Sequence, residues 1–258
     1  MIDAGTPSRG LEHKREGTAM IKAVTFDCWN TLIVDDEQRA EKMQTYFQAI
    51  FEENKIFLSN EDISTVLSDE LVLFENHVAC HRKTPNARGR AETIFRLAGI
   101  ELPEERLLRV AHDCDHMALD VPPPLVPGVK ETLESLAESH ALAVICNTGF
   151  HGATTLREIL SNHGLMPYFQ HLTFSDEAGV AKPHKRIFHM TLQALSARPE
   201  ESVHVGDSEP ADISGAKLAG LRAVLFTGVN QRYAEENTAH AVVAAYADLP
   251  GVLQSLAA

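Results

Sequence analysis

Three aspartates and one lysine lie just after predicted strands of this chain, where their side chains could do chemistry. Asp27 follows the first predicted strand, Lys182 follows the third, and Asp207 and Asp212 follow the fourth. A carboxylate at a strand end can attack a phosphoryl or alkyl centre and form a covalent intermediate. A second carboxylate loop can share Mg²⁺ with it, because this cation prefers oxygen ligands. A lysine nearby would neutralise the crowded anions, so the four residues predict nucleophilic catalysis beside a metal.

A further polar segment follows the second predicted strand and contains Cys146, Asn147 and Thr148. Amides and hydroxyls in such a loop can hold the oxygens of a group in transfer. Parallel α/β sheets bind ligands at the carboxyl ends of their strands, where the loops converge. We therefore expect this segment to lie beside the aspartates.

Alternating strands and helices are the elements that must position these residues. Short β-rich runs predict the strands, and apolar residues at helical period predict the helices between them. The predicted strands are 21–26, 141–146, 171–175, 202–206 and 222–226, and the helices among them are 128–139, 152–163, 184–196 and one ending near Gly220. This alternation is typical of βα units with a parallel sheet and predicts the α/β class.

A helical insertion interrupts this alternation just after the first strand. Four stretches between residues 36 and 118 carry apolar residues at helical period. Asn60 is predicted to cap the second helix and Pro103 to open the fourth, and the run VPPPLVPG at 121–128 is predicted to be a linker. The predicted organisation is a flexible extension at 1–19, a core at 20–34 and 123–258, and a helical insertion at 35–122.

The segments FDCWNTL, AVICNTG, AKP and GDSEPAD occur in this order, each associated with a predicted strand end. With these four motifs the sequence resembles the haloacid dehalogenase-like (HAD) hydrolase superfamily over residues 20–250. The resemblance implies a Rossmann-like parallel sheet core. It also implies a cap domain inserted after motif one, which is where the four predicted helices lie.

The resemblance implies roles for individual residues as well. Asp27 would be the nucleophile and Lys182 its charge partner. Mg²⁺ would be held by Asp27, Asp207 and the backbone carbonyl of Trp29, with Asp212 behind these ligands. The phosphate-binding residues would be Cys146, Asn147 and Thr148.

Trp29 is the main departure from the phosphatases of this family, which carry a second aspartate as general acid/base at that position. An indole offers one N–H donor and exchanges no proton near neutral pH. A general acid/base contribution of roughly 10²- to 10⁴-fold is therefore missing. The family's dehalogenases also lack this aspartate and typically carry tyrosine there, so Trp29 favours a dehalogenase or phosphoryl substrates with good leaving groups.

Motif four favours a phosphatase instead. The metal-free dehalogenases resemble SSNxxD there and have no acid at the position of Asp207, and they carry tyrosine where this chain has Phe188. Retention of Asp207 is expected if a cation is bound. In motif two, Cys146 stands where the family has serine or threonine, and a thiol is a weak hydrogen-bond donor, so Thr148 is an alternative hydroxyl.

Other candidates lie outside the four motifs. His151 and His184 flank the motif loops and are candidates to replace the missing acid/base, although a solvated loop position is the simpler interpretation. The segment HRKTPNARGR at 81–90 is the cap's one basic patch. It is expected either to contact an anionic group of the substrate or to face solvent.

Charge and composition restrict the partners. The chain has 36 acidic and 23 basic residues, a net charge of −13, which argues against a nucleic-acid binder because such proteins need a cationic surface. The segment 35–122 has 18 acidic and 10 basic residues (−8), and the core has 15 and 10 (−5). No apolar run approaches the roughly 20 residues of a membrane span. Four separated cysteines and no visible signal peptide predict a cytoplasmic protein with free thiols.

The sequence therefore predicts a cytoplasmic Mg²⁺-dependent HAD-like phosphohydrolase that acts on a small anionic substrate through an aspartyl-phosphate on Asp27. The alternatives are a metal-free 2-haloacid dehalogenase, a non-catalytic binding module that has lost its acid, and a phosphonate-cleaving enzyme using Lys42 or Lys55 as a Schiff base. The sequence specifies neither the substrate nor the oligomeric state.

Overall fold

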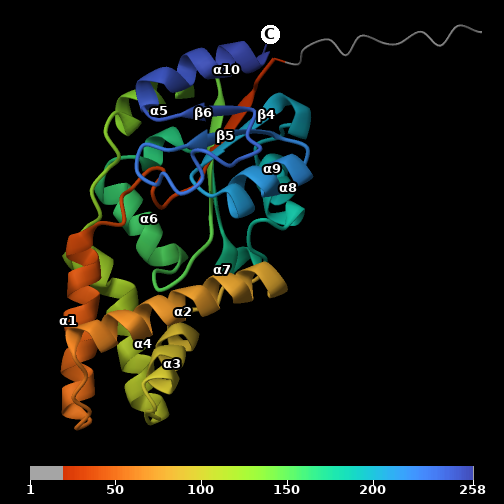
Figure 1. Cartoon of the computed structure of the whole chain (residues 1–258). Coiled ribbons are helices and arrows are strands. Elements are labelled where there is room, and N and C mark those ends of the chain that lie inside the picture. The colour runs from red at the N-terminus through yellow and green to blue at the C-terminus, as the bar shows by residue number, and fades with distance from the viewer. Residues whose placement is uncertain (1–19, 258) are drawn as a thin grey trace, which may run out of the picture.

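A computed structural model describes residues 20–257 of the chain. The predicted flexible extension at 1–19 lies outside the described residues. Figure 1 shows two parts, a sheet with helices on both faces and a group of long helices that extends from one edge of it. Within residues 20–257, no helix is long and apolar enough to cross a membrane.

The core is one parallel sheet of six strands in the order β3-β2-β1-β4-β5-β6. The strands are β1 (Ala23–Phe26), β2 (Ala141–Cys146), β3 (His171–Phe174), β4 (Ser202–Gly206), β5 (Arg222–Phe226) and β6 (Ala241–Val243). β1 and β4 are buried along their whole length, as expected for strands covered on both faces. The central strand β1 pairs with β2 and with β4, so the loops after these three strands meet at one edge.

Helices cover both faces of this sheet. Side chains of α5 (Val129–Ala137), α6 (Ala153–Asn162) and α10 (Leu249–Ala257) share one apolar cluster with β1. Side chains of α8 (Lys185–Ala194) and α9 (Ser214–Leu218) form a second cluster with β5 on the opposite face. The shorter helical segments are η1 (Met166–Tyr168), α7 (Ser175–Ala178), η2 (Pro199–Glu201), the π-helical η3 (Glu209–Ile213) and η4 (Tyr246–Asp248).

The inserted helices form a cap with its own apolar core. They are α1 (Glu37–Glu53), α2 (Asn60–His81), α3 (Ala87–Leu97) and α4 (Glu104–Asp120). Phe47, Phe51 and Phe95 pack against one another with ring centroids 5.8–6.2 Å apart, an arrangement that adds to the energy of burial. All four helices fall within the predicted insertion, and the boundaries at 35 and 122 stay predictions.

The helical start signals differ slightly from those expected. Ser59, rather than Asn60, caps α2, because its hydroxyl accepts from the N–H of Asp62 while the Asp62 carboxylate accepts from the N–H of Ser59. This reciprocal pair satisfies two amides that the helix leaves unpaired. Pro103 directly precedes α4, as predicted.

The sheet and the inserted helices together confirm the predicted α/β class with a parallel sheet and an inserted helical cap.

Candidate active site

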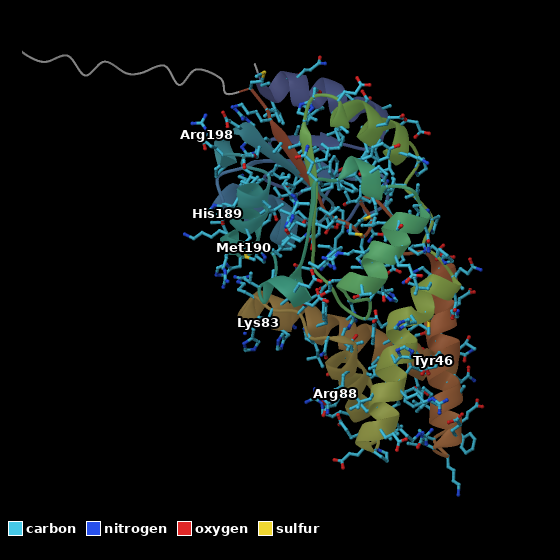
Figure 2. The ribbon with its side chains drawn as sticks, turned by 180° about the vertical axis from the view of Figure 1, so that it is seen from behind. Tyr46, Lys83, Arg88, His189, Met190 and Arg198 are labelled. Atoms are coloured by element: carbon cyan, nitrogen blue, oxygen red, sulfur yellow. The ribbon has the colours of Figure 1, made fainter. Side chains whose placement is uncertain are left out.

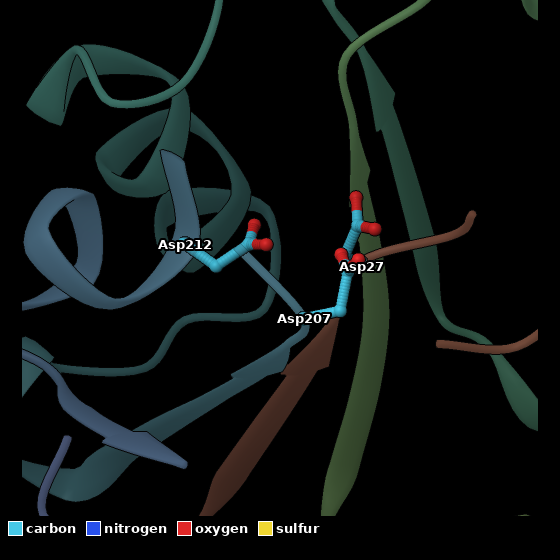
Figure 3. A group of neighbouring side chains, drawn as sticks. All are labelled: Asp27, Asp207 and Asp212. Atoms are coloured by element: carbon cyan, nitrogen blue, oxygen red, sulfur yellow. The ribbon is translucent and has the colours of Figure 1, made fainter. Parts of the chain in front are cut away.

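The strand ends bring three carboxylates and one ammonium group together at the edge of the sheet. One carboxylate oxygen from each of Asp27, Asp207 and Asp212 lies within 4.8 Å of the others (Figure 3). The Nζ of Lys182 donates to Asp27 Oδ1 at 2.5 Å and to Asp212 Oδ1 at 2.6 Å. All four side chains are buried. The register of β1 and β4, in which Phe26 is opposite Val205, accounts for the approach of Asp27 and Asp207.

Asn147 holds the backbone of Lys182 in place. Its Oδ1 accepts from the N–H of Lys182 at 2.8 Å, and its Nδ2 donates to the carbonyl of Lys182 at 3.1 Å. This pair of bonds joins the loop after β2 to the segment that presents the ammonium group. The phosphate-binding role of Asn147 stays a prediction, and the geometry adds a positioning role to it.

Asp212 is held by three hydrogen-bond donors. Besides Lys182, its Oδ1 accepts from His204 Nε2 at 3.1 Å, and its Oδ2 accepts from the N–H of Ser208 at 3.0 Å. Gly206 makes this position possible, because a Cβ at that residue would lie 2.4 Å from the Asp212 carboxyl carbon. Asp212 therefore orients Lys182, and its place outside the metal ligands stays a prediction.

The electrostatics divide the three carboxyl groups into two kinds. Burial raises the pKa of Asp27 to about 7, with Lys182 opposing and Asp212 adding to the shift. Burial likewise raises the pKa of Asp207 to about 6, and the charge on Asp212 adds to it. Burial also opposes ionisation of Asp212, but Lys182 and His204 outweigh it and hold the pKa of that carboxyl well below its usual range. Asp27 and Asp207 therefore lack the nearby positive charge that would keep their pKa values at the usual level.

The side chains fit a hard divalent cation at this edge. Three buried carboxylates face one lysine, so the fully ionised group carries a charge of −2. Asp212 is committed to its own donors, which leaves Asp27 and Asp207 with free oxygen atoms. Oxygen ligands with excess negative charge suit Mg²⁺, which binds few carboxylates and keeps waters or substrate oxygens.

The second motif is held by hydroxyl groups that the sequence analysis did not identify. The N–H of Thr148 donates to Ser175 Oγ at 2.9 Å, and the two hydroxyl oxygens lie 3.0 Å apart. Thr84, from the cap, reaches the same Ser175 at 2.7 Å. Cys146 is buried, and its hydrogen bond with Cys28 and its burial raise the pKa of its thiol far above the usual value. Thr148 and Cys146 remain predicted phosphate-binding residues.

Trp29 is enclosed by two other side chains. The Arg39 guanidinium lies 4.9 Å from the indole centroid, and the His151 ring lies 5.6 Å from it. Arg39 Nη2 is 2.7 Å from His151 Nε2, and His151 Nδ1 is 2.7 Å from the carbonyl oxygen of Asp115. Because arginine can only donate and a carbonyl can only accept, the proton of the neutral imidazole is on Nδ1.

This arrangement argues against His151 as a replacement acid. Burial lowers the pKa of His151 to about 4, and both ring nitrogens have partners. His184 is exposed and caps α8, where its Nδ1 accepts from the N–H of Arg186. The geometry gives neither histidine a role in proton transfer.

Two further site residues could have been found from the sequence by the same rules. Asn230 donates to Asp207 Oδ2 at 2.8 Å from the loop after β5, and the strand-end rule applied to that strand would have included it. His204 is a polar residue inside a buried strand, which requires a buried partner. By contrast, the contact of Thr84 with Ser175 depends on how the cap docks and has no sequence signal.

A protein-family model described as haloacid dehalogenase-like hydrolase matches residues 21–220 of the chain. Glyceraldehyde 3-phosphate phosphatase of Methanopyrus kandleri is 30% identical over 209 residues, which are 80% of this chain and 83% of that protein. Phosphoserine phosphatase of Thermus thermophilus is 41% identical over 103 residues, which are 39% of this chain and 40% of that protein.

Solved structures share the whole architecture. The crystal structure of 2-haloacid dehalogenase from Pseudomonas syringae pv. Tomato superposes with a TM-score of 0.65 at 23% identity, over 92% of this chain and 99% of that one. At that level of identity the likeness shows the fold alone. The same scaffold therefore carries phosphatases and dehalogenases, and the side chains at the strand ends must distinguish them.

Proposed function

This chain belongs to the haloacid dehalogenase-like hydrolase family, and on that premise we propose that it is a Mg²⁺-dependent phosphohydrolase that acts on a small phosphorylated metabolite. The observation that carries the proposal is the buried pair of carboxylates, Asp27 and Asp207, with raised pKa values beside Lys182. A metal-free dehalogenase has no use for Asp207. The curated relatives from M. kandleri and T. thermophilus, both named as phosphatases of small phosphorylated molecules, support the same choice.

The proposed reaction begins with attack by a carboxylate oxygen of Asp27 on the phosphorus atom. A bond from Asp27 to phosphorus forms as the bond to the leaving oxygen breaks, and an aspartyl-phosphate results. Water then attacks the phosphorus, releases inorganic phosphate and restores the carboxylate. Lys182 holds the nucleophile through its 2.5 Å contact and supplies one positive charge.

Mg²⁺, bound by Asp27 and Asp207 and by the backbone carbonyl of Trp29, would keep both carboxyl groups ionised and neutralise charge on the phosphoryl oxygens. Asp212 would keep Lys182 oriented, and Asn230 would keep Asp207 in place through its 2.8 Å bond. Cys146, Asn147 and Thr148 are the residues proposed to hold the phosphate, together with the backbone amides of their loop.

The choice of leaving group follows from Trp29. Neither the indole nor His151 can protonate a departing oxygen near neutral pH. The leaving groups of acyl and aryl phosphates depart as weakly basic anions and need little protonation. The leaving groups of alkyl phosphates would depart as strongly basic alkoxides. We therefore propose a preference for acyl or aryl phosphates over sugar phosphates.

A phosphate-release assay with and without Mg²⁺ tests this function. We expect Mg²⁺-dependent turnover of acetyl phosphate and p-nitrophenyl phosphate, and slower turnover of glucose 6-phosphate. Asp27→Asn should abolish turnover, while Asp248→Asn, which changes an exposed aspartate outside the proposed site residues, should leave it intact. Equal rates for aryl and sugar phosphates would contradict the leaving-group argument.

The alternatives predict different outcomes in the same experiment. A 2-haloacid dehalogenase, the function that the lack of an acid at Trp29 would also permit, releases chloride from 2-chloropropionate without metal. A non-catalytic binding module binds ligand but is not trapped by beryllofluoride at Asp27. A phosphonate-cleaving enzyme needs a cap lysine, yet Lys42 forms an ion pair with Asp120 at 3.2 Å.

A cytoplasmic location stays part of the proposal, and all four cysteines are free.

A further inference from the structure

A cavity of about 320 Å³ lies between the cap and the catalytic edge of the core. Its core side includes Lys182 and Asn147, and its cap side is the last part of α2, from Phe74 to Arg82. Small-molecule sites commonly enclose about 300–1,000 Å³. This cavity therefore has room for the part of a small substrate that extends from the phosphoryl group.

The backbone of Arg82 is fixed at the edge of this cavity. It ends α2 in the left-handed conformation, with φ of 55°, a region that favours glycine or asparagine. Its carbonyl oxygen accepts from the N–H of Ala181 at 2.7 Å. That bond fixes the end of α2, and with it the backbone of Arg82, against the residue that precedes Lys182.

The Arg82 side chain has no partner among residues 20–257. No hydrogen bond or ion pair to its guanidinium is formed within this part of the chain, and the side chain is partly buried. The other arginines of the basic segment are already paired. Arg88 binds Glu104 and Glu92, and Arg90 binds Glu70 while stacked between Phe74 and Phe150.

A second guanidinium faces the cavity from the core. Arg232, in the loop after β5, lines the same space with Tyr233. Its only ion pair within the described chain is a long one, 3.7 Å to Glu75, and both side chains are more than half exposed. Lys182, in contrast, already donates to both Asp27 and Asp212. The cavity therefore offers cationic groups beyond those that the chemistry uses.

We propose that this cavity selects substrates with a second anionic group, a carboxylate or a further phosphate, which binds Arg82 with support from Arg232. This inference rests on the proposed phosphohydrolase function and names its substrate class. A planar guanidinium binds such oxygen pairs through two parallel hydrogen bonds. The Glu75 carboxylate competes for Arg232, so Arg82 carries most of the selectivity.

Two aryl phosphates test the proposal, 4-carboxyphenyl phosphate and its neutral match 4-carbamoylphenyl phosphate. We expect kcat/KM to favour the carboxylate, and Arg82→Gln to reduce the ratio of the two values roughly 10- to 100-fold, the effect of losing a hydrogen-bonded charge pair. Comparing ratios between variants cancels the intrinsic reactivity of the two esters. Arg82→Lys, which keeps the charge, should recover part of the ratio.

Arg88→Gln is the matched control, because it removes a charge from the same segment at a residue of α3 that binds Glu104 and Glu92 and does not line this cavity (Figure 2). It should leave the ratio unchanged. Glu75→Gln should raise the ratio by freeing Arg232. Benzene-1,4-diyl bisphosphate distinguishes a second phosphate from a carboxylate, according to whether its kcat/KM or that of 4-carboxyphenyl phosphate falls more in Arg82→Gln.

Binding to the Asp27→Asn variant separates this proposal from the proposed function. Calorimetry with the same two probes reports the preference without turnover. One outcome is that the unsubstituted protein hydrolyses neither ester, while Asp27→Asn binds 4-carboxyphenyl phosphate more tightly than its neutral match and loses this preference when Arg82→Gln is added. In that case the phosphatase function fails and the anion site stands. If both are hydrolysed and the ratio in Arg82→Gln equals that of the unsubstituted protein, the anion site is overturned.

Discussion

At the scale of single residues, the proposed leaving-group preference depends on Trp29. The indole occupies the position from which an aspartate would protonate a departing oxygen, and Arg39 and His151 enclose it. The nearest histidine is neutral and has both nitrogens bonded. The proposed site thus has groups for nucleophilic attack, but neither Trp29 nor His151 can donate a proton to a leaving group near neutral pH.

Replacement of Trp29 by aspartate should restore part of the missing function. A carboxyl group at this position would lie beside Arg39, which would stabilise its ionised form between proton transfers. We expect the ratio of kcat/KM for glucose 6-phosphate to that for p-nitrophenyl phosphate to rise at least about tenfold, against the 10²- to 10⁴-fold that acid/base catalysis typically contributes. Trp29→Phe should keep the original ratio, and an equal rise in that variant would contradict the acid/base explanation.

The central residues of the site could be predicted because they follow strands. Asp27, Asp207 and Asp212 lie within a few residues of strands whose burial is visible in the sequence. The parallel pairing that joins these strands then brings the carboxylates together. The partners of the site depend on long-range contacts, such as that between Thr84 and Ser175, which are 91 residues apart. No local pattern specifies those contacts.

At the scale of elements, one of the connections between cap and core passes through a histidine. Arg39 on α1 donates to His151, which follows the loop of motif two, and His151 in turn donates to the carbonyl of Asp115 on α4. Asp115 also accepts from the N–H of Gly152 at 2.8 Å. The first and last cap helices are therefore joined to the core at the same point.

Protonation of His151 should break this connection. Its pKa is about 4 in the folded protein against 6.5 as the usual value. The unfolded chain therefore binds more protons between pH 6.5 and 4, and the contribution of the neutral histidine to stability is lost as pH falls through this range. The free energy of unfolding falls by at most about 3 kcal/mol through this histidine.

Urea unfolding at pH 7 and pH 4.5 measures this effect. The free energy of unfolding should fall less on acidification in His151→Gln than in the unsubstituted protein. His189→Gln, which changes an exposed histidine on α8 (Figure 2), is the control and should keep the original pH dependence. Identical pH dependence in His151→Gln and the unsubstituted protein would contradict the proposed connection.

The elements themselves differ in how far they can be predicted. β1, β2, β4 and β5 are nearly fully buried, so their apolar runs stand out. β6 has three residues and is largely accessible, and such a short run of alanine and valine predicts no particular element. The four cap helices can be predicted because each buries one apolar stripe in the cap's own core.

At the scale of the whole molecule, the net charge of −13 is distributed unevenly. The segment 35–122 carries −8, yet its side of the cavity presents Arg82. The core carries fewer acids, but three of them are buried together at one edge. A surface that is broadly acidic thus surrounds a pocket with local positive charge, which favours small anions over extended polyanions.

The buried acids should make the stability of the protein depend on pH and, through the proposed Mg²⁺ site, on metal in a linked way. Asp27 and Asp207 have pKa values of about 7 and about 6 in the folded state, against 3.8 as the usual value. The folded protein binds more protons than the unfolded chain between about pH 4 and pH 7, so these two groups lower stability as pH rises. The lowered pKa of Asp212 acts in the opposite sense, but only as pH falls below 3.8.

Mg²⁺ should offset this loss, since it binds the ionised carboxylates and not the protonated ones. We expect Mg²⁺ at about a hundredfold excess over its Kd to raise Tm by about 5 °C or more at pH 8, and by much less at pH 5. Asp207→Asn should melt higher than the unsubstituted protein without metal at pH 8, because one uncompensated charge is gone, and should gain little from Mg²⁺. Asp248→Asn should respond to Mg²⁺ like the unsubstituted protein. An equal gain at both pH values, or a full gain in Asp207→Asn, would mean that the cation binds elsewhere.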